Sequence, residues 1–361
     1  MTQRTLAGLL AVPLLVALWF QVLREPLPYV IYAPGLTVDV LGTTDGDEEG
    51  SEIIEVSGAE TYEDDGQLRL TTVLVTQPQT DVNLFQLLGA WIDGDDAVYP
   101  YDSIYGPQDT DASKDEEGAF QMATSQDDAI AVALTELGYD VNPSPVVSVV
   151  LEQSPADGEL EVGDHLLAIN GAEVTSIEDA GQAVDEAPDG EPVELRILRG
   201  KEERTLSITR AEIDGQLRLG FEMRNSYQFP VQVNVGVDPA IGGPSAGLMF
   251  SLAIYDTLTE GSMTGGESVA GTGTIAADGA VGPIGGIDQK IAGAREDGAG
   301  LFLVPAENCD DAYESPNGDM RLTRVATMSE AVDAVEAWAA DSDADLPQCT
   351  ADAAETDDAG E

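Results

Sequence analysis

The sequence has 361 residues, of which 68 are aspartate or glutamate and 15 are lysine or arginine, so its formal net charge is −53. This length predicts two or three domains, and the 43% hydrophobic content predicts folded ones. So acidic a chain repels other polyanions, which excludes DNA and RNA as partners. The two cysteines, Cys309 and Cys349, are too few for a zinc site and leave one disulfide or two free thiols as alternatives.

The chain begins with an uncharged apolar run over residues 6–23. As a helix this run would measure about 27 Å, enough to span a bilayer. A cleaved signal peptide is the alternative, but residues 24–29 hold no small-x-small cleavage site. We therefore expect a signal anchor over residues 1–28. The acidic bulk and the cysteine pair favour an extracytoplasmic body on a single-pass membrane protein.

Residues 29–140 predict an α+β region of no recognisable type. Residues 32–35 (Tyr-Ala-Pro-Gly) are typical of a turn, and residues 68–75 predict a β-strand. Residues 102–118 are rich in acids, glycine and proline and predict a loop or linker. A helix is expected over 124–138, capped at its start and ended by a glycine.

Residues 141–222 form a second unit, with predicted strands at 146–150, 192–198 and 204–210 and a capped helix at 175–186. Three short motifs resemble bacterial PDZ domains of the protease-associated kind: Ser154-Pro155-Ala156, Gly163-Asp164 and Ile169-Asn170-Gly171. That resemblance implies binding of extended or C-terminal peptides by strand addition. The glycine loop that such domains place before the first strand is replaced here by residues 140–145. His165 is interpreted as a packing or surface residue.

The sequence Asp-Pro-Ala-Ile-Gly-Gly-Pro-Ser-Ala-Gly at residues 238–247 places Ser245 on a tight turn before an apolar run that suits a buried helix. A serine at such a turn presents its hydroxyl clear of the backbone. Backbone N–H groups around Gly243, Pro244 and Ala246 are expected to face a developing oxyanion.

A serine nucleophile needs a base. The chain has three lysines, Lys114, Lys201 and Lys290, and Lys290 follows a second glycine-rich turn at the start of a predicted helix, residues 288–297. Burial and the positive end of a helix both favour the neutral amine that a base requires. Each motif alone also fits an ordinary turn or a solvated lysine. Together they predict a serine–lysine dyad.

Three segments resemble, in order and spacing, the proteolytic domain of Lon proteases: residues 243–247, 269–275 and 282–290. The resemblance implies an α+β domain over residues 223–341, of the ribosomal protein S5 domain 2-like kind, in which Ser245 is the nucleophile, Lys290 the general base and Thr272 the residue that orients the lysine. Gly242 and Thr274 depart from the family, which has acidic residues at both positions.

The chain lacks a Walker A loop, which predicts a protease that works without ATP, other cofactors or metals. The full order of anchor, α+β region, PDZ unit and protease domain resembles the YlbL-like family of membrane-anchored serine proteases. This implies an α+β multidomain endopeptidase acting on membrane-associated or secreted proteins, with the PDZ unit selecting or gating substrates. Lon-type domains also imply a ring-shaped homo-oligomer. The alternative is a catalytically inert binding or assembly scaffold at the membrane. Residues 342–361 predict an acidic, disordered tail.

Overall fold

The computed structural model describes residues 11, 13–14, 26–44, 50–200, 202–213 and 215–350. The expected anchor run, residues 6–23, lies outside the described residues except for three positions, so the anchor stays a prediction. Within the described residues, no helix is both long and apolar enough to cross a membrane.

The larger body is built on a six-stranded sheet, counted over the described residues, in the order β20-β19-β16-β3-β1-β4. The strands β1, β3 and β4 pair antiparallel, whereas β16, β19, β20 and the β3–β16 pair run parallel. The strands are β1 (Tyr29–Asp39), β3 (Gln67–Val75), β4 (Ala97–Pro100), β16 (Ser268–Gly271), β19 (Leu301–Pro305) and β20 (Arg321–Val325).

This sheet corrects two expectations. Residues 29–140 do not form a unit apart from residues 223–341, because three strands from each lie in the same sheet. Residues 32–35 are not a turn but part of β1, which bends there through a register shift between Pro34 and Thr37. Gly35 is required at that point, because a Cβ on it would lie 2.3 Å from Oγ1 of Thr72.

Helices cover both faces of the sheet. One apolar cluster joins α4, α6 and α9 to the sheet, and a second lies beneath α7 and α8. The helices are α2 (Leu84–Ile92), α3 (Tyr101–Ile104), α4 (Asp111–Glu136), α6 (Gly247–Thr257), α7 (Ile287–Glu296), the 3₁₀ helix η1 (Ala306–Asn308), α8 (Cys309–Ala312) and α9 (Met328–Ala340).

The helix α4 is longer than the sequence indicated. The expected loop over 102–118 is wrong for residues 102–104, which belong to α3, and for residues 111–118. The helix α4 begins at Asp111, after an N-cap at Thr110 that forms a capping box with Ser113. Lys114 stabilises this first turn by pairing with Asp109 at 3.3 Å and with Glu117 at 2.9 Å.

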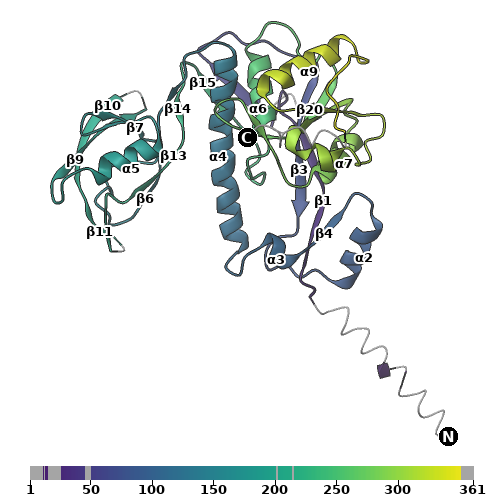
Figure 1. Cartoon of the computed structure of the whole chain (residues 1–361), viewed down its shortest axis with the longest axis horizontal. Helices are drawn as coiled ribbons and strands as arrows, with labels where there is room; N and C mark the ends of the chain where they lie inside the picture. Colours follow the sequence, from purple (N-terminus) through teal and green to yellow (C-terminus); the bar gives the residue numbers. More distant parts are fainter. Residues whose placement is uncertain are drawn as a thin grey trace.

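The chain leaves the larger body after α4 and forms a second sheet with its own apolar core (Figure 1). Over the described residues this sheet has the order β10-β9-β7-β6-β13, with β8 paired to β7, and α5 packs against it. Its elements are β6 (Val146–Val150), β7 (His165–Ile169), β8 (Ala172–Glu173), α5 (Ile177–Asp185), β9 (Pro192–Arg199), β10 (Glu202–Thr209) and β13 (Phe221–Arg224), with a hairpin of β11 (Ala211–Ile213) and β12 (Gln216–Arg218).

Short two-stranded pairs complete the fold. The strand β5 (Asn142–Pro143), which enters the second body, pairs with β14 (Tyr227–Gln228), which leaves it. The pair β17 (Thr274–Ile275) and β18 (Val281–Gly282) lies beside α6. The strand β15 (Gln232–Val235) pairs with β2 (Ile54–Ser57). The strand β15 therefore lies outside the central sheet.

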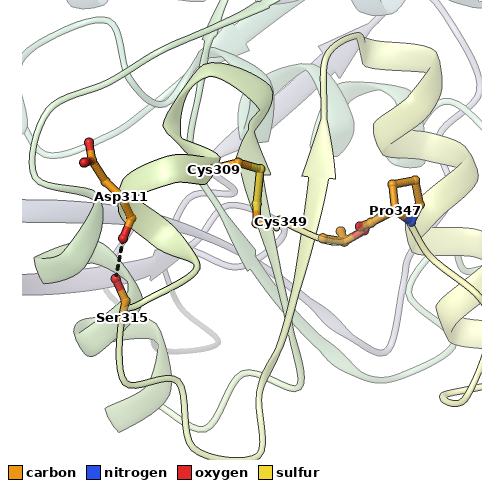
Figure 2. Close-up of a disulfide and its surroundings, with 6 residues drawn as sticks. Cys309, Asp311, Ser315, Pro347 and Cys349 are labelled. Atoms are coloured by element: carbon orange, nitrogen blue, oxygen red, sulfur yellow. Dashed lines mark hydrogen bonds between the residues drawn. A yellow bond between two sulfur atoms is a disulfide. The ribbon is translucent and has the colours of Figure 1, made fainter. Parts of the chain in front are cut away.

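A disulfide joins Cys309 to Cys349 across 40 residues (Figure 2). This bond settles the alternative between a disulfide and two thiols. The segment before Cys349 lies along β20, where the carbonyl of Pro347 accepts hydrogen bonds from the Thr323 hydroxyl (2.7 Å) and the Arg324 N–H (3.0 Å). The side chain of Leu346 is buried beside them. The expected disordered tail over 342–361 is therefore wrong for residues 342–350, and its remainder lies outside the described residues.

Candidate active site

Ser245 lies on the turn that leads into α6. Every residue of α6 from Gly247 to Ile254 is buried, so this helix is fixed in the core and holds the turn in place. Gly243 has a φ of +91°, a left-handed conformation that glycine adopts without strain. The turn is therefore specified by Gly243 before the serine and by the buried helix after it.

Lys290 lies on α7, whose first residue follows Gly286, with a φ of +69°. The side chain of Lys290 is 3% exposed, and its Nζ donates a hydrogen bond of 2.9 Å to Oγ1 of Thr272. No carboxylate of the described residues pairs with this ammonium. Burial lowers the pKa of Lys290 to about 7. A substantial fraction of the side chain is therefore the neutral amine near neutral pH.

Thr272 connects the lysine to the serine turn. Its hydroxyl accepts from Lys290 and donates to the backbone carbonyl of Ser245 at 3.0 Å. The N–H of Gly273 donates to the same carbonyl at 2.9 Å. The structure thus brings together all three residues that the sequence assigned to catalysis, with the threonine between the other two.

The two members of the predicted dyad line one cavity of about 550 Å³. Among the described residues, however, the Ser245 hydroxyl has no hydrogen-bond partner, Lys290 included. Catalytic hydrogen bonds are often long without substrate and close in the complex. The cavity is mainly apolar, and the side chains that line it include Leu36, Val38, Ile53, Leu70, Val73, Leu74, Met122 and Ile241.

One wall of this cavity is the end of β3. The strand pairs with β16 only as far as Leu70, opposite Gly271. Within the described chain, residues 72–75 of β3 have no strand on that side, although residues 73–75 remain paired with β1 on the other. The backbone beside Ser245 and Lys290 is therefore an open strand edge.

The turn offers fewer oxyanion donors than expected. The N–H of Gly243 donates to the carbonyl of Gly118 at 2.9 Å, and Pro244 has no N–H group. Within the described residues, the N–H groups of Ser245 and Ala246 have no acceptor. In this arrangement these two groups, rather than that of Gly243, are free to meet a substrate oxygen.

The helix α4 holds the turn at two points, which the sequence did not indicate. Besides the carbonyl of Gly118, the hydroxyl of Ser125 donates to the carbonyl of Pro244 at 2.9 Å. The sequence predicts a loop at Gly118 and therefore gives no indication of this contact. A glycine within a helix was the available signal, since it permits close backbone approach.

The same contact explains why Gly242 stands where an acidic residue was expected. A Cβ on Gly242 would lie 3.2 Å from Cα and 3.3 Å from the carbonyl carbon of Gly118. A side chain at position 242 would therefore require the turn or the backbone of α4 to shift by a few tenths of an ångström. Glycine at position 242 therefore allows the backbone of α4 to lie close to the serine turn.

The second body presents an open edge of its own. The strand β13 ends its sheet within the described residues, and the glycine turn Leu219-Gly220-Phe221 leads into it. Gly220 has a φ of +89° and lies against Ser154, whose hydroxyl donates to the Gly220 carbonyl at 3.0 Å. The sequence predicts no glycine loop at this position, because the resemblance to PDZ domains places such a loop before the first strand. His165 lies in β7, its Nδ1 3.2 Å from the carbonyl of Ser144, and not near the cavity.

Comparison with known families agrees with this geometry. Residues 197–337 match the model of the Lon protease (S16) C-terminal proteolytic domain, and residues 146–199 match a PDZ domain. The chain contains a Lon-type proteolytic domain and a PDZ domain. The family resemblance inferred from the motifs is thereby confirmed for these two domains.

Among curated proteins, the Lon-type domain is 28% identical over 140 residues to the Lon protease of Syntrophomonas wolfei, covering 39% of this chain and 17% of that protein. It is 32% identical over 158 residues to the Lon protease of Buchnera aphidicola, covering 43% and 18%. The chain thus spans less than a fifth of these relatives. The PDZ domain aligns with that of an SdrC-like protein from Listeria innocua at 23% identity and a TM-score of 0.21, covering 22% of this chain and 92% of that one.

The structure adds strands and a helix to the matched Lon-type region. The strands β1, β3 and β4 and the helix α4 precede the PDZ domain in sequence, yet they complete the sheet and cover the serine turn. The PDZ domain is therefore an insertion in the fold of the Lon-type domain, between α4 and β15.

Proposed function

We propose that the chain is a serine endopeptidase in which Ser245 attacks the peptide bond and Lys290 is the general base. The observation that carries this is the buried Lys290 amine, with its pKa lowered to about 7, held by a threonine that also holds the serine turn. The match to a Lon proteolytic domain supports the same reaction. We propose that it proceeds without ATP, because the sequence lacks a Walker A loop.

In this mechanism, substrate binding brings the Ser245 hydroxyl to Lys290 Nζ. The neutral amine takes the hydroxyl proton as Oγ attacks the carbonyl carbon, and the N–H groups of Ser245 and Ala246 hold the resulting oxyanion. The lysine then gives its proton to the leaving amine, which leaves an acyl-enzyme. The same amine activates the water that releases the acyl group. Thr272 keeps Nζ in place through both steps.

The open edge of β3 supports an extended substrate. A peptide that added a strand beside residues 72–75 would satisfy the free backbone groups there. It would also place a side chain in the apolar cavity next to Ser245. We propose that the site accepts unfolded or extended chains with an apolar residue beside the cleaved bond.

The pH dependence of activity tests the base. Because the active form of Lys290 is the neutral amine, kcat/KM for labelled unfolded casein should fall about tenfold per pH unit below pH 7 and level off above about pH 8. The full-length protein should be assayed without ATP. Activity that is highest below pH 6 would contradict a lysine base, and no cleavage at any pH would favour the inert scaffold.

We propose that the protein is a YlbL-like protease, anchored in the cell membrane by residues 6–23 with its body outside the cytoplasm. The disulfide supports an oxidising compartment. The uncharged N-terminal run supports the anchor. Membrane-associated or secreted proteins would then be its substrates.

We further propose that the PDZ domain gates the protease through α4. A peptide would bind at the free edge of β13, whose last residue, Arg224, forms an ion pair with Asp127 of α4. Three residues on, the Tyr227 hydroxyl donates to Asp128 of the same helix at 2.8 Å. The helix α4 also holds the serine turn. A movement of the segment that leaves the PDZ domain would therefore move α4, and with it the N–H groups that hold the oxyanion.

Gating predicts that a saturating C-terminal peptide ligand of the PDZ domain changes the rate of casein cleavage by about fivefold or more. Tyr227→Phe combined with Asp127→Asn should remove this response, because both links to α4 are broken. Isothermal titration of the same peptide supplies the control, since its affinity should stay within about twofold. A wild-type rate that ignores a bound peptide would show that the PDZ domain only recruits substrate.

A further inference from the structure

The helix α2 presents an apolar face that nothing in the described structure covers. The sequence of this helix, Leu-Phe-Gln-Leu-Leu-Gly-Ala-Trp-Ile, carries no charge. Trp91 is 81% exposed, Ile92 80% and Leu88 42%. Leu88 and Ile92 are one turn apart, with Trp91 beside them, so they form one surface. The helix itself is well defined, with a capping box of Asn83 and Gln86 at its start.

This face lies where the chain enters the structure. Leu27 pairs with Val82 just before α2, its N–H 2.9 Å from the Val82 carbonyl. Leu27 is only a few residues beyond the uncharged run 6–23. Figure 1 shows α2 and the start of β1 at the same end of the larger body. Tyr29 of β1 and Tyr99 of the edge strand β4, each 39% exposed, add aromatic side chains at this end.

We propose that α2 lies in the headgroup region of a lipid bilayer, with Leu88, Trp91 and Ile92 pointing into the lipid. This inference rests on the proposed anchoring by residues 6–23. That anchor would end a few residues before Leu27, which pairs with Val82 next to α2. Nine residues of helix are about 13 Å long, too short to cross a bilayer. An apolar helix face with an outward tryptophan and neighbouring tyrosines suits the interface instead.

The charges around α2 favour lipid over a second copy of the chain. Asp81 and Asp93, which flank α2 in the sequence, are exposed. A symmetric contact through this face would bring the acidic rims of two copies together, at the cost of like-charge repulsion. A zwitterionic bilayer imposes no such penalty, whereas an anionic one does. The expected surface is therefore a neutral phosphatidylcholine-type headgroup layer.

The position of α2 is coupled to the catalytic helix. Asp95, in the turn after α2, pairs with Arg295 of α7 at 2.7 Å, and its carbonyl accepts from the Gln289 side chain at 3.1 Å. Gln289 directly precedes Lys290. A membrane contact by α2 thus fixes how far the catalytic lysine lies from the bilayer, which suits cleavage of substrates close to the membrane.

Tryptophan fluorescence in vesicles tests this inference. The chain has three tryptophans, and Trp338 is buried in the core, so in full-length protein carrying Trp19→Phe the change in emission on adding vesicles reports on Trp91. After reconstitution into phosphatidylcholine vesicles, its emission should shift to the blue, resist iodide and be quenched by brominated acyl chains. The Trp19→Phe/Trp91→Phe variant should lose the component that the lipid quenches. Doping with anionic lipid at low salt should weaken the quenching.

Three results would overturn the inference. If the protein floats with the vesicles but iodide still quenches Trp91, the anchor holds and α2 does not contact the membrane. Trp91 shielded from iodide but insensitive to brominated lipid would show that protein, in the form of a second copy, covers the face. If the protein does not float with the vesicles, the proposed anchor is wrong, and so is this inference. Casein cleavage by the same samples reports separately on the proposed protease.

Discussion

Ser245→Ala should abolish casein cleavage by the full-length protein, with a loss in kcat/KM of at least about ten-thousandfold, and Lys290→Arg should do the same. Alanine removes the attacking oxygen. Arginine keeps the positive charge but cannot become a neutral base in a protein. The measurement is the initial rate of release of labelled casein fragments at pH 8, where the wild-type lysine is neutral.

Lys290→Met supplies the matched control for folding. Methionine has nearly the shape of the lysine side chain and places no charge in a site that is 3% exposed. Its Tm should equal or exceed that of the wild type, because an amine that has no carboxylate partner no longer has to be desolvated. It should still be inactive. A Lys290→Arg or Lys290→Met enzyme that retains near-normal turnover would show that another group is the base.

Breaking the disulfide with Cys349→Ser should lower the free energy of unfolding by about 4 kcal/mol, given its 40-residue loop. For a body of this size that is a fall in Tm of roughly 10 °C. Serine at position 349 leaves the buried Cys309 in place, so the core is unchanged and the loss is confined to the crosslink. The strap of residues 342–350 should then separate from β20.

Differential scanning calorimetry with and without dithiothreitol measures this effect. The reduced wild type should have the same Tm as the Cys349→Ser variant. The Tm of that variant should not change when the reductant is added. Limited trypsin digestion gives a local readout, since Arg321 and Arg324 lie under the strap. A wild-type Tm that is the same in both buffers would mean that the segment is held by its hydrogen bonds and Leu346 alone.

The sequence predicted the site better than the sheet around it. The turn at Ser245, the helix that carries Lys290 and the strand before Thr272 depend on short motifs in which a glycine, an apolar run and a polar residue follow one another. Such local patterns fix local structure. The structure places the hydroxyl of Thr272 between Lys290 and the serine turn, in line with the role that the family resemblance implied.

The elements that were missed depend on contacts between distant residues. The Thr71 hydroxyl donates to the carbonyl of Gly271, 200 residues away, and this part of β3 adjoins β16. Nothing in residues 29–140 alone indicates that their strands pair with strands that follow the PDZ domain in the sequence. The same holds for Gly118, whose carbonyl is the acceptor for the Gly243 N–H. In the sequence, a glycine among acidic residues favours a loop. Only the structure shows that Gly118 lies against the backbone of the serine turn.

The placement of the PDZ domain within the Lon-type fold has a consequence for biogenesis. A chain is made from its N-terminus, so β1, β3, β4 and α4 emerge well before β16, β19 and β20. The PDZ domain has its own core and can fold in the interval, while its β5–β14 ribbon brings the two halves of the larger body close together. Until β16 arrives, the inner edge of β3 stays open to pairing with other chains. The strand edge that is proposed to bind substrate in the folded protein is thus an edge that can pair wrongly before β16 arrives. The inserted domain lengthens that interval, because it is made between α4 and β16, while its β5–β14 pair holds the two halves near each other.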